Sequence, residues 1–189
     1  MKNFKRVFDL LICIPFLLLL IMPMLLIGFL VRITSYGPVF YWSLRVGYKG
    51  EMFLMPKYRT MYIHTPELAS DKLEHPNCYI TSIGKFLRKT SLDELPQLWS
   101  IIKGDMSLVG PRPALYNQKY LISLRSQCGV DLIMPGLTGW AQVNGRDNLS
   151  IEEKVSFDKE YLSKYSIYFD IYILCLTVFK VLANHDISH

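Results

Sequence analysis

The chain has 189 residues, which suffices for one catalytic domain and a short additional segment but not for two full domains. Hydrophobic residues make up 51% of it and charged residues 20%, which excludes a bundle of membrane helices and favours a polar body attached to a membrane. The net charge of +5 indicates an anionic partner, and because no nucleic-acid-binding signature is present, we expect a phosphorylated ligand or an anionic membrane surface, not nucleic acid.

The first predicted element is an apolar helix from Leu10 to Val31, which at about 1.5 Å per residue is long enough to reach across a bilayer core of roughly 30 Å. Pro23 predicts a bend near its middle, because proline removes a backbone donor. Basic residues flank both ends: Lys2, Lys5 and Arg6 before it, Arg32, Arg45 and Lys49 after it. A re-entrant helix keeps both flanks in the cytoplasm, whereas a kinked transmembrane helix does not, and this segment alone leaves both interpretations open.

The body is predicted to start with a β-hairpin and to continue as helices. We expect strands at 39–43 and 52–58 around a turn at 47–50, helices at 82–89, 92–103, 114–128, 151–164 and 167–183, and loops at 104–113 and 135–145. The last helix is rich in aromatic residues, which suits either the membrane interface or core packing.

Cysteine and histidine spacing argues against a disulfide framework and a zinc site. The four cysteines lack CxxC spacing, so we expect reduced thiols in a protein that faces the cytosol. The four histidines form no recognisable ligand set. Any metal should therefore be a hard cation held by carboxylate.

The stretch from Ser91 to Trp99 places Asp93 and Glu94 side by side near the start of a predicted helix. One interpretation is structural, because Ser91 and Glu94 have the spacing of a capping box and acids favour the first helical turn. The other is chemical: backbone N–H groups and the helix dipole would keep Asp93 ionised, as a nucleophile or metal ligand must be, and would favour a phosphate beside it. The sequence leaves both open.

Basic residues accompany the glycine- and proline-rich segments. Arg88, just before the acids, is either part of a basic last helical turn or a charge-assisted donor to phosphate. Arg112 lies between two prolines, and such a fixed guanidinium suits a diphosphate or a uracil edge. Arg146 ends a second loop whose glycines can bring backbone donors close to a ligand. Together with the paired acids, these elements indicate phosphate chemistry.

Four ordered segments, Lys57–Met61, Ser91–Leu98, Lys103–Pro113 and Pro135–Arg146, resemble the bacterial sugar transferase family. These are small monotopic polyprenyl-phosphate phosphoglycosyl transferases, and the short form is similar to the bacillosamine-phosphate transferase that begins bacterial N-glycosylation. The resemblance covers essentially the whole chain, including the apolar N-terminal segment.

The resemblance implies an α+β, mostly helical fold. Residues 1–35 would form a re-entrant helix-break-helix and residues 36–189 a cytosolic catalytic domain with a C-terminal interfacial helix, at the bacterial inner membrane. An enzyme that uses nucleotide-sugars must keep its body in the cytoplasm, which favours the re-entrant interpretation. Many family members have Ser-Pro at the bend, where this chain has Met22-Pro23, so here the bend depends on proline alone.

For the reaction, the resemblance implies a magnesium-dependent, two-step transfer. Asp93 would attack the phosphate next to the sugar of a UDP-sugar, release UMP and carry the sugar phosphate until polyprenyl phosphate accepts it. Asp93 is also an implied metal ligand, and Glu94 would position the metal or a proton. The implied substrate- and phosphate-binding residues are Lys57, Arg59, Arg88, Arg112 and Arg146.

The implied partners are the UDP-sugar, the polyprenyl phosphate acceptor, membrane phospholipid and downstream glycosyltransferases of glycan, O-antigen, capsule or exopolysaccharide assembly. Two other functions compete with the transferase. The first is a membrane-anchored scaffold that binds phospholipid or a partner enzyme without catalysis. The second is a phosphatase or pyrophosphatase that uses the same aspartyl intermediate. The sequence specifies neither the sugar nor the oligomeric state.

Overall fold

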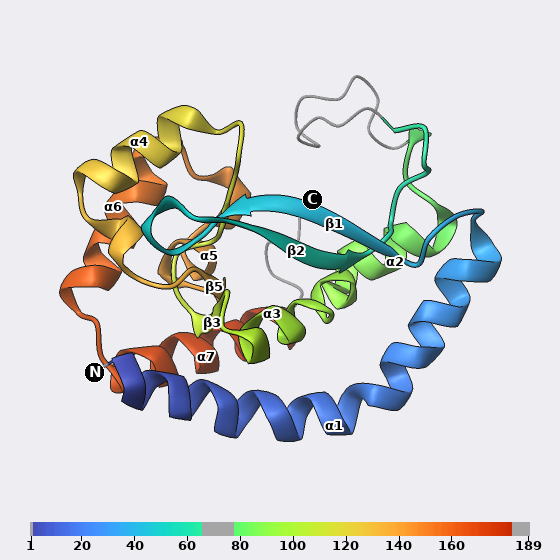
Figure 1. Cartoon of the computed structure of the whole chain (residues 1–189), viewed down its shortest axis with the longest axis horizontal. Helices are drawn as coiled ribbons and strands as arrows, with labels where there is room; N and C mark the ends of the chain where they lie inside the picture. The colour runs from blue at the N-terminus through green and yellow to red at the C-terminus, as the bar shows by residue number, and fades with distance from the viewer. Residues whose placement is uncertain (1, 66–77, 183–189) are drawn as a thin grey trace.

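A computed structural model describes residues 2–65 and 78–182 and confirms the α+β, mostly helical class (Figure 1). The helices are α1 (Lys2–Thr34), α2 (Ser82–Thr90), α3 (Gln97–Lys103), α4 (Lys119–Gln127), α5 (Trp140–Val143), α6 (Ile151–Ser163) and α7 (Ile167–Leu182). The strands are β1 (Phe40–Val46), β2 (Met52–Tyr58), β3 (Ser107–Val109), β4 (Ala114–Leu115) and β5 (Gly136–Thr138). Short 3-10 turns are η1 (Tyr48–Gly50), η4 (Leu92–Glu94), η5 (Val130–Leu132) and η6 (Arg146–Asn148).

The predicted hairpin is present, and its second strand has the predicted bounds. β1 pairs with β2 in an antiparallel register that runs from Phe40 opposite Tyr58 to Val46 opposite Met52. β1 therefore extends beyond the predicted 39–43, because its pairing continues to the end of β2. The short strand β4 adds to the other edge of β1, and β3 pairs with β5 in parallel. The sequence missed these three strands, since each is stabilised by a partner far away in the chain.

The predicted helices are present with two differences. The helix expected at 92–103 consists of η4 followed by α3, with Pro96 between them, and proline has no N–H to continue the backbone ladder. The helix expected at 114–128 begins only at Lys119, because residues Ala114 and Leu115 pair with β1. Of the last predicted helix, Ala183 lies outside the described residues.

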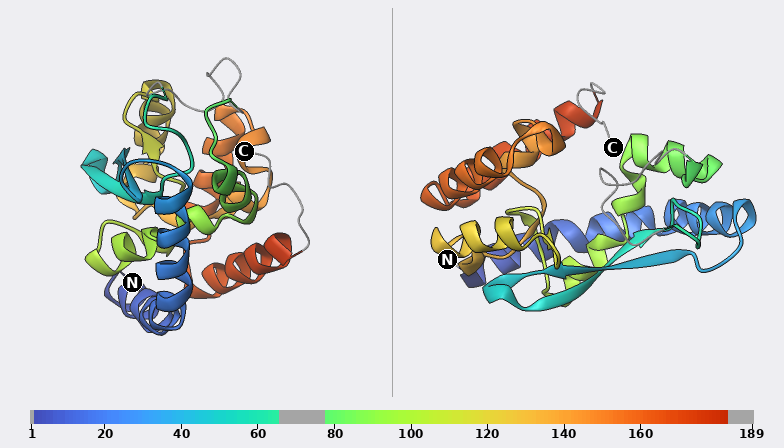
Figure 2. Two further views of the ribbon diagram at one scale, coloured as in Figure 1. Left: turned by 90° about the vertical axis from the view of Figure 1, so that its right-hand side faces the viewer. Right: turned by 90° about the horizontal axis from the view of Figure 1, so that it is seen from above.

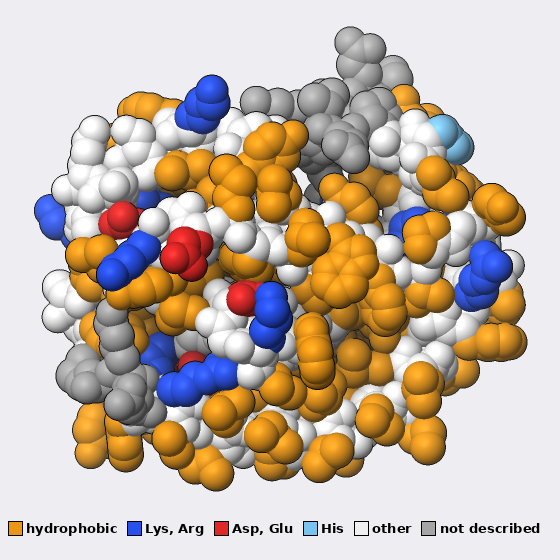
Figure 3. All heavy atoms as spheres, in the orientation of Figure 1, with side chains coloured by type: hydrophobic (Ala, Val, Ile, Leu, Met, Phe, Trp, Pro, Cys, Tyr) orange, Lys and Arg blue, Asp and Glu red, His pale blue; other side chains and the backbone are white. Residues whose placement is uncertain are grey.

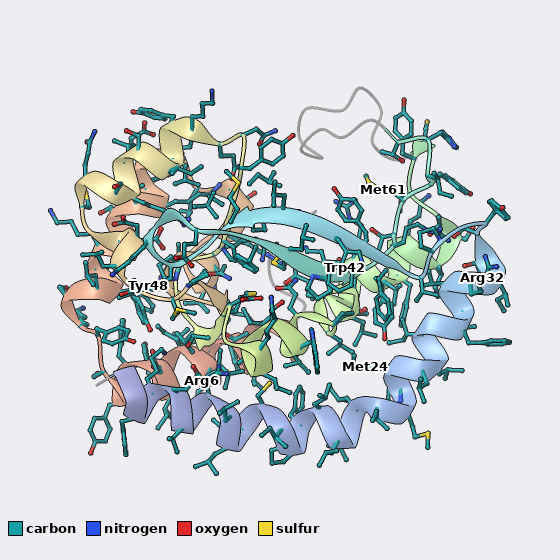
Figure 4. All side chains as sticks on the ribbon, viewed as in Figure 1. Arg6, Met24, Arg32, Trp42, Tyr48 and Met61 are labelled. Carbon is teal, nitrogen blue, oxygen red and sulfur yellow. The ribbon has the colours of Figure 1, made fainter. Side chains whose placement is uncertain are left out.

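α1 is one continuous helix that contains both Pro15 and Pro23. It runs along one side of the body and then changes direction close to Met24, which is labelled in Figure 4. The predicted break is thus a bend without an interruption of the helix, as expected where proline removes a single ladder bond. By length and composition, the segment Phe4–Thr34 could cross a membrane.

Both ends of α1 are attached to the same body. Near its start, the Lys5 ammonium donates to Asp170 of α7 and to the Tyr161 hydroxyl of α6, all within the buried interior. Beyond the bend, the Tyr58 hydroxyl of β2 donates to the carbonyl oxygen of Met24 at 2.7 Å. The hairpin and α7 lie on opposite sides of α1 in both views of Figure 2. α1 is therefore held on both sides of its bend, by α6 and α7 near its start and by β2 at Met24.

The outer surface of α1 is apolar and exposed, as at Leu18, Met22 and Phe29. In Figure 3, apolar side chains gather over α1 along the lower edge of the molecule and over the hairpin. On α7, Ile173 is fully buried in the core, whereas Phe179 is 66% exposed. One face of α7 thus packs in the core and the other is exposed, and the contact of the exposed face with a membrane interface stays a prediction.

We expect Lys5→Met to lower the free energy of unfolding by about 3–5 kcal/mol, because it leaves the Asp170 charge buried without its partner. Lys103→Met is the matched control, since it removes the same charge from a pair with Asp105 in which the lysine side chain is 60% exposed. Exposed pairs contribute only about 0–1 kcal/mol. Chemical denaturation in detergent, followed by circular dichroism, measures both variants, and equal losses would contradict the prediction.

Candidate active site

Asp93 and Glu94 lie in the tight connection between α2 and α3. Ser91 ends α2 in the left-handed conformation, with φ of 56°, and its N–H donates to the carbonyl of Arg88. Its side chain makes no capping bond to η4, so the predicted capping box is wrong. A residue that closes one helix in the left-handed region cannot adopt the extended conformation that an N-cap requires. The turn instead directs both acids into the body, where they are buried.

The Glu94 carboxylate binds two cations from different parts of the chain. Its Oε1 accepts from Lys57 Nζ at 2.6 Å and from Arg112 Nη2 at 2.8 Å, and its Oε2 lies 3.5 Å from Arg112 Nη1. Burial alone would raise the pKa of Glu94, but the charges of Arg112 and Lys57 outweigh it and hold this pKa well below its usual range. Glu94 is therefore ionised, and its oxygens are committed to positioning these two side chains.

Asp93 has a different environment. Its side chain is buried, with 5% of the residue exposed, and its Oδ1 has no hydrogen-bond partner in the structure. Burial raises the pKa of Asp93 above its ordinary value, although Lys57 and Arg88 act in the opposite direction. Desolvation thus opposes the effect expected of a helix terminus on this acid, and η4 is only a single turn. A cationic ligand or metal would reverse the shift.

Four of the five predicted basic residues act on the acidic pair. Lys57 of β2 and Arg112 of the β3–β4 loop contact Glu94 directly. The charge of Arg88, at the end of α2, lowers the pKa of Asp93, and that of Arg146, in η6, lowers the pKa of Glu94. The fold thus brings together cations from four separate segments, as a site for a diphosphate requires.

Arg59 is the exception. It follows β2, and its Nη2 donates at 2.8 Å to both the carbonyl and the hydroxyl oxygen of Ser35, just beyond α1. It is buried there, 6% exposed, beside Gly37. These contacts place Arg59 at the end of the apolar helix and not at the acidic pair. Its described contacts favour a role in joining α1 to the hairpin over the predicted substrate contact.

The sequence did not reveal two arginines that hold the Arg112 loop. Arg125 of α4 donates to the carbonyl of Arg112 at 2.7 Å and pairs with the buried Asp158 of α6 at 2.7 Å. Arg45 of β1 donates to the carbonyl of Pro113 at 3.0 Å. Both contacts are long-range, and nothing in the local pattern distinguishes either residue from an ordinary surface charge.

The two glycine-bearing loops pack against each other. A Cβ at Gly139 would lie 2.1 Å from the carbonyl oxygen of Gly110, and one at Gly110 would lie 2.3 Å from that of Met134. These glycines therefore permit a close backbone approach alongside the β3–β5 pairing, where the sequence predicted an approach to a ligand. Their packing fixes Arg112 and Arg146 on neighbouring segments.

The site offers limited but suitable ligands for magnesium. Among the described residues, no three His, Cys, Asp or Glu side chains gather as a metal site. Asp93 Oδ1 is buried and unpartnered, whereas Glu94 is occupied by Lys57 and Arg112. Magnesium is commonly bound by one or two carboxylates together with substrate phosphates. The residues present therefore fit a magnesium ion that is held jointly by Asp93 and by the phosphates of a bound diphosphate.

The chain belongs to the bacterial sugar transferase family, whose sequence profile matches residues 1–184. It is 41% identical to the uncharacterized sugar transferase EpsL of Bacillus subtilis (strain 168), over 97% of this chain and 90% of that protein.

Two further relatives have names that state a reaction. The chain is 38% identical to the UDP-glucose:undecaprenyl-phosphate glucose-1-phosphate transferase of Escherichia coli (strain K12), over 95% of this chain but 40% of the relative. It is 36% identical to the undecaprenyl-phosphate galactose phosphotransferase of Salmonella typhimurium, over 96% of this chain and 41% of the relative. The similarity to the bacillosamine-phosphate transferase stays a prediction.

We expect Asp93→Asn to be more stable than the wild type at pH 8. Because the folded-state pKa of Asp93 is raised, ionisation above the ordinary value of 3.8 opposes folding, and each tenfold weakening of the acid costs about 1.4 kcal/mol. The amide avoids this cost, so its advantage should disappear as the pH falls from the raised pKa to 3.8. Melting temperatures measured from pH 4 to pH 8 test this, and a variant less stable than the wild type at pH 8 would contradict it.

Proposed function

We propose that the protein transfers a sugar phosphate from a UDP-sugar to undecaprenyl phosphate and releases UMP. The observation that carries this proposal is Asp93: a buried carboxylate with one unpartnered oxygen, surrounded by Lys57, Arg88 and Arg112. Named relatives in the same family carry out this class of reaction. The product would be the first membrane intermediate of a glycoconjugate such as an exopolysaccharide.

In the proposed mechanism, Asp93 is the nucleophile. Its unpartnered oxygen attacks the phosphorus next to the sugar, and the bond from that phosphorus to UMP breaks, leaving a sugar phosphate on Asp93. The phosphate of undecaprenyl phosphate then attacks the same phosphorus and frees Asp93, which gives a ping-pong reaction. A bound magnesium ion, with Asp93 as its protein ligand, would neutralise the diphosphate and so favour both the ionised Asp93 and departure of UMP.

Glu94 supports this chemistry without taking part in bond changes. It holds Lys57 and Arg112 beside Asp93, where the two cations balance charge on the phosphate oxygens. Arg88 and Arg146 add charge from the flanking segments. This assignment replaces the expected role of Glu94 in positioning a metal or a proton, because both of its oxygens face Arg112.

A cavity of about 160 Å³ beside the Arg112 loop is our candidate for the uracil end of the donor. It is lined by Pro111, Pro113, Lys49, Arg125 and Asp131, among others. It is smaller than the roughly 300–1,000 Å³ of pockets that enclose a whole ligand, so it would hold a base while the phosphates extend toward Asp93. Arg112 connects this cavity with the acidic pair, since it lines the cavity and its guanidinium also binds Glu94.

We further propose that α1 is re-entrant and that the body faces the cytoplasm at the inner membrane. The buried Lys5–Asp170 pair and the Tyr58–Met24 bond attach both halves of α1 to one body, and a span would have to break one of them. In this arrangement, phospholipid contacts α1 and α7. Downstream glycosyltransferases contact the cytoplasmic body.

Protease protection tests the topology. We expect a peptide tag placed before Met1 to be digested in inside-out membrane vesicles and protected in intact spheroplasts, as for a tag placed after His189. A membrane-spanning α1 gives the opposite result for the N-terminal tag, because the two ends of the chain would then lie on opposite sides.

For the reaction, we expect purified protein with magnesium and a suitable UDP-sugar to release UMP, and Asp93→Asn to reduce the release to background. Without the lipid, wild type should release one UMP per active protein and gain the mass of the sugar phosphate on Asp93. Asp105→Asn is the matched control, since this acid pairs with Lys103 away from the site. Magnesium removal by a chelator should stop the release. A panel of UDP-sugars in the same assay identifies the donor.

Other outcomes distinguish the competing functions. Continuous UMP release without lipid would indicate a phosphatase or pyrophosphatase. Lipid binding with no UMP from any donor, unchanged in Asp93→Asn, would indicate a scaffold. Normal turnover by Asp93→Asn would refute the covalent mechanism.

A further inference from the structure

Gln97 is a buried polar residue next to the acidic pair that the mechanism above leaves unused. It is the first residue of α3, it is 2% exposed, and its Nε2 has no hydrogen-bond partner in the structure. A buried donor without a partner carries a cost in stability. Such a cost at an otherwise well-packed position is expected where a ligand supplies the missing partner.

The backbone places Gln97 on the same face as the acids. Leu95 and Pro96, between η4 and α3, both have right-handed helical dihedral angles, so the chain winds continuously from Leu92 into α3. The N–H of Leu95 donates to Leu92 and that of Leu98 to Leu95, so this stretch winds with three residues per turn. Gln97 follows Glu94 by three residues and therefore lies in line with it, one turn further along and beside the acidic pair.

The two unpartnered atoms are chemically complementary. Gln97 Nε2 is a donor, Asp93 Oδ1 is an acceptor, and neither is bonded to the other or to a third group in the structure. Glu94, in contrast, is satisfied by Lys57 and Arg112. For the transfer proposed above, a ligand that uses both atoms is attacked by the carboxylate oxygen and accepts a hydrogen bond from the amide. A phosphoryl group does both, through its phosphorus and its non-bridging oxygens.

We propose that Gln97 is a catalytic residue whose Nε2 donates a hydrogen bond to a non-bridging oxygen of the phosphoryl group that Asp93 attacks. This inference rests on the proposed function. In the first half-reaction a bond forms from the Asp93 oxygen to phosphorus, the bond to UMP breaks, and its electron pair leaves with UMP. In the second, the lipid phosphate forms the new bond and the Asp93 oxygen leaves. Because the same phosphoryl group takes part in both steps, Gln97 acts in both.

Gln97→Met tests the proposal, because it keeps the length of the side chain and removes the donor. We expect kcat to fall by about 10²–10³-fold, the usual effect of removing one donor to a developing charge. The KM for the UDP-sugar should stay within about threefold, since the bond is strongest in the transition state. The melting temperature should be unchanged or higher, because a buried unpaired donor is gone.

The two half-reactions are measured separately. Rapid-quench UMP release follows the first, and addition of undecaprenyl phosphate to the preformed sugar-phosphate protein follows the second; both should slow in Gln97→Met. Gln127→Met is the matched control, since Gln127 is exposed on α4. Gln97→Glu, which keeps the shape and replaces the amide nitrogen by oxygen, gives a second variant if the first does not fold.

Three results would overturn this inference. One is a kcat close to that of the wild type in both variants. Another is a loss of stability that accompanies the loss of activity, which would indicate a structural role. The third is slowing of the first half-reaction alone, which would assign Gln97 to the departing UMP. Normal turnover by Asp93→Asn would instead refute the proposed function, and this inference with it.

Discussion

The buried charge of Glu94 constrains the surrounding structure. An ionised carboxylate in the interior is stable only with cationic partners, and here these come from β2, as Lys57, and from the β3–β4 loop, as Arg112. The hairpin, the α2–α3 connection and the Pro-Arg-Pro loop must therefore converge on one point. Arg125 and Arg45 hold the carbonyl groups of that loop, so the requirement extends to α4 and β1. Oδ1 of the neighbouring Asp93 is left among cationic side chains without a hydrogen-bond partner.

Two kinds of buried polar group occur in the structure, those that stabilise the fold and those that we propose take part in the reaction. In the buried ion pairs Lys5–Asp170 and Arg125–Asp158, each charged side chain has an oppositely charged partner. The first pair connects α1 to α7 and the second connects α4 to α6. At the site, Asp93 Oδ1 and Gln97 Nε2 are buried and unpartnered, on residues four apart in the chain. Buried polar atoms without a partner are expected where binding supplies one, and a phosphoryl group would serve both of these atoms.

The position of the site relative to the apolar surface follows from the attachment of α1. The Lys5 end contacts α7, and the Met24 bend contacts the end of β2, one residue from Lys57. Lys57, which binds Glu94, is thus adjacent in β2 to Tyr58, which binds the apolar helix α1. A reaction between a soluble nucleotide-sugar and a lipid phosphate requires such proximity, because the acceptor phosphate stays at the membrane surface.

The sequence by itself determined the elements that depend on local pattern: the strand Met52–Tyr58, the start of α2 at Ser82, the apolar helix with its proline, the acidic pair and most of its cations. Only the tertiary structure decided what the acids do. It showed that Ser91 closes α2 and does not cap the next helix. It also showed that Glu94 is a counter-ion while Asp93 Oδ1 has no partner, and that Arg59 binds Ser35. The β3–β5 pair and the role of Arg125 were likewise beyond the sequence. The reason is physical: periodicity and turn chemistry act over a few residues, whereas burial, ion pairing and strand partners depend on segments that only folding brings together.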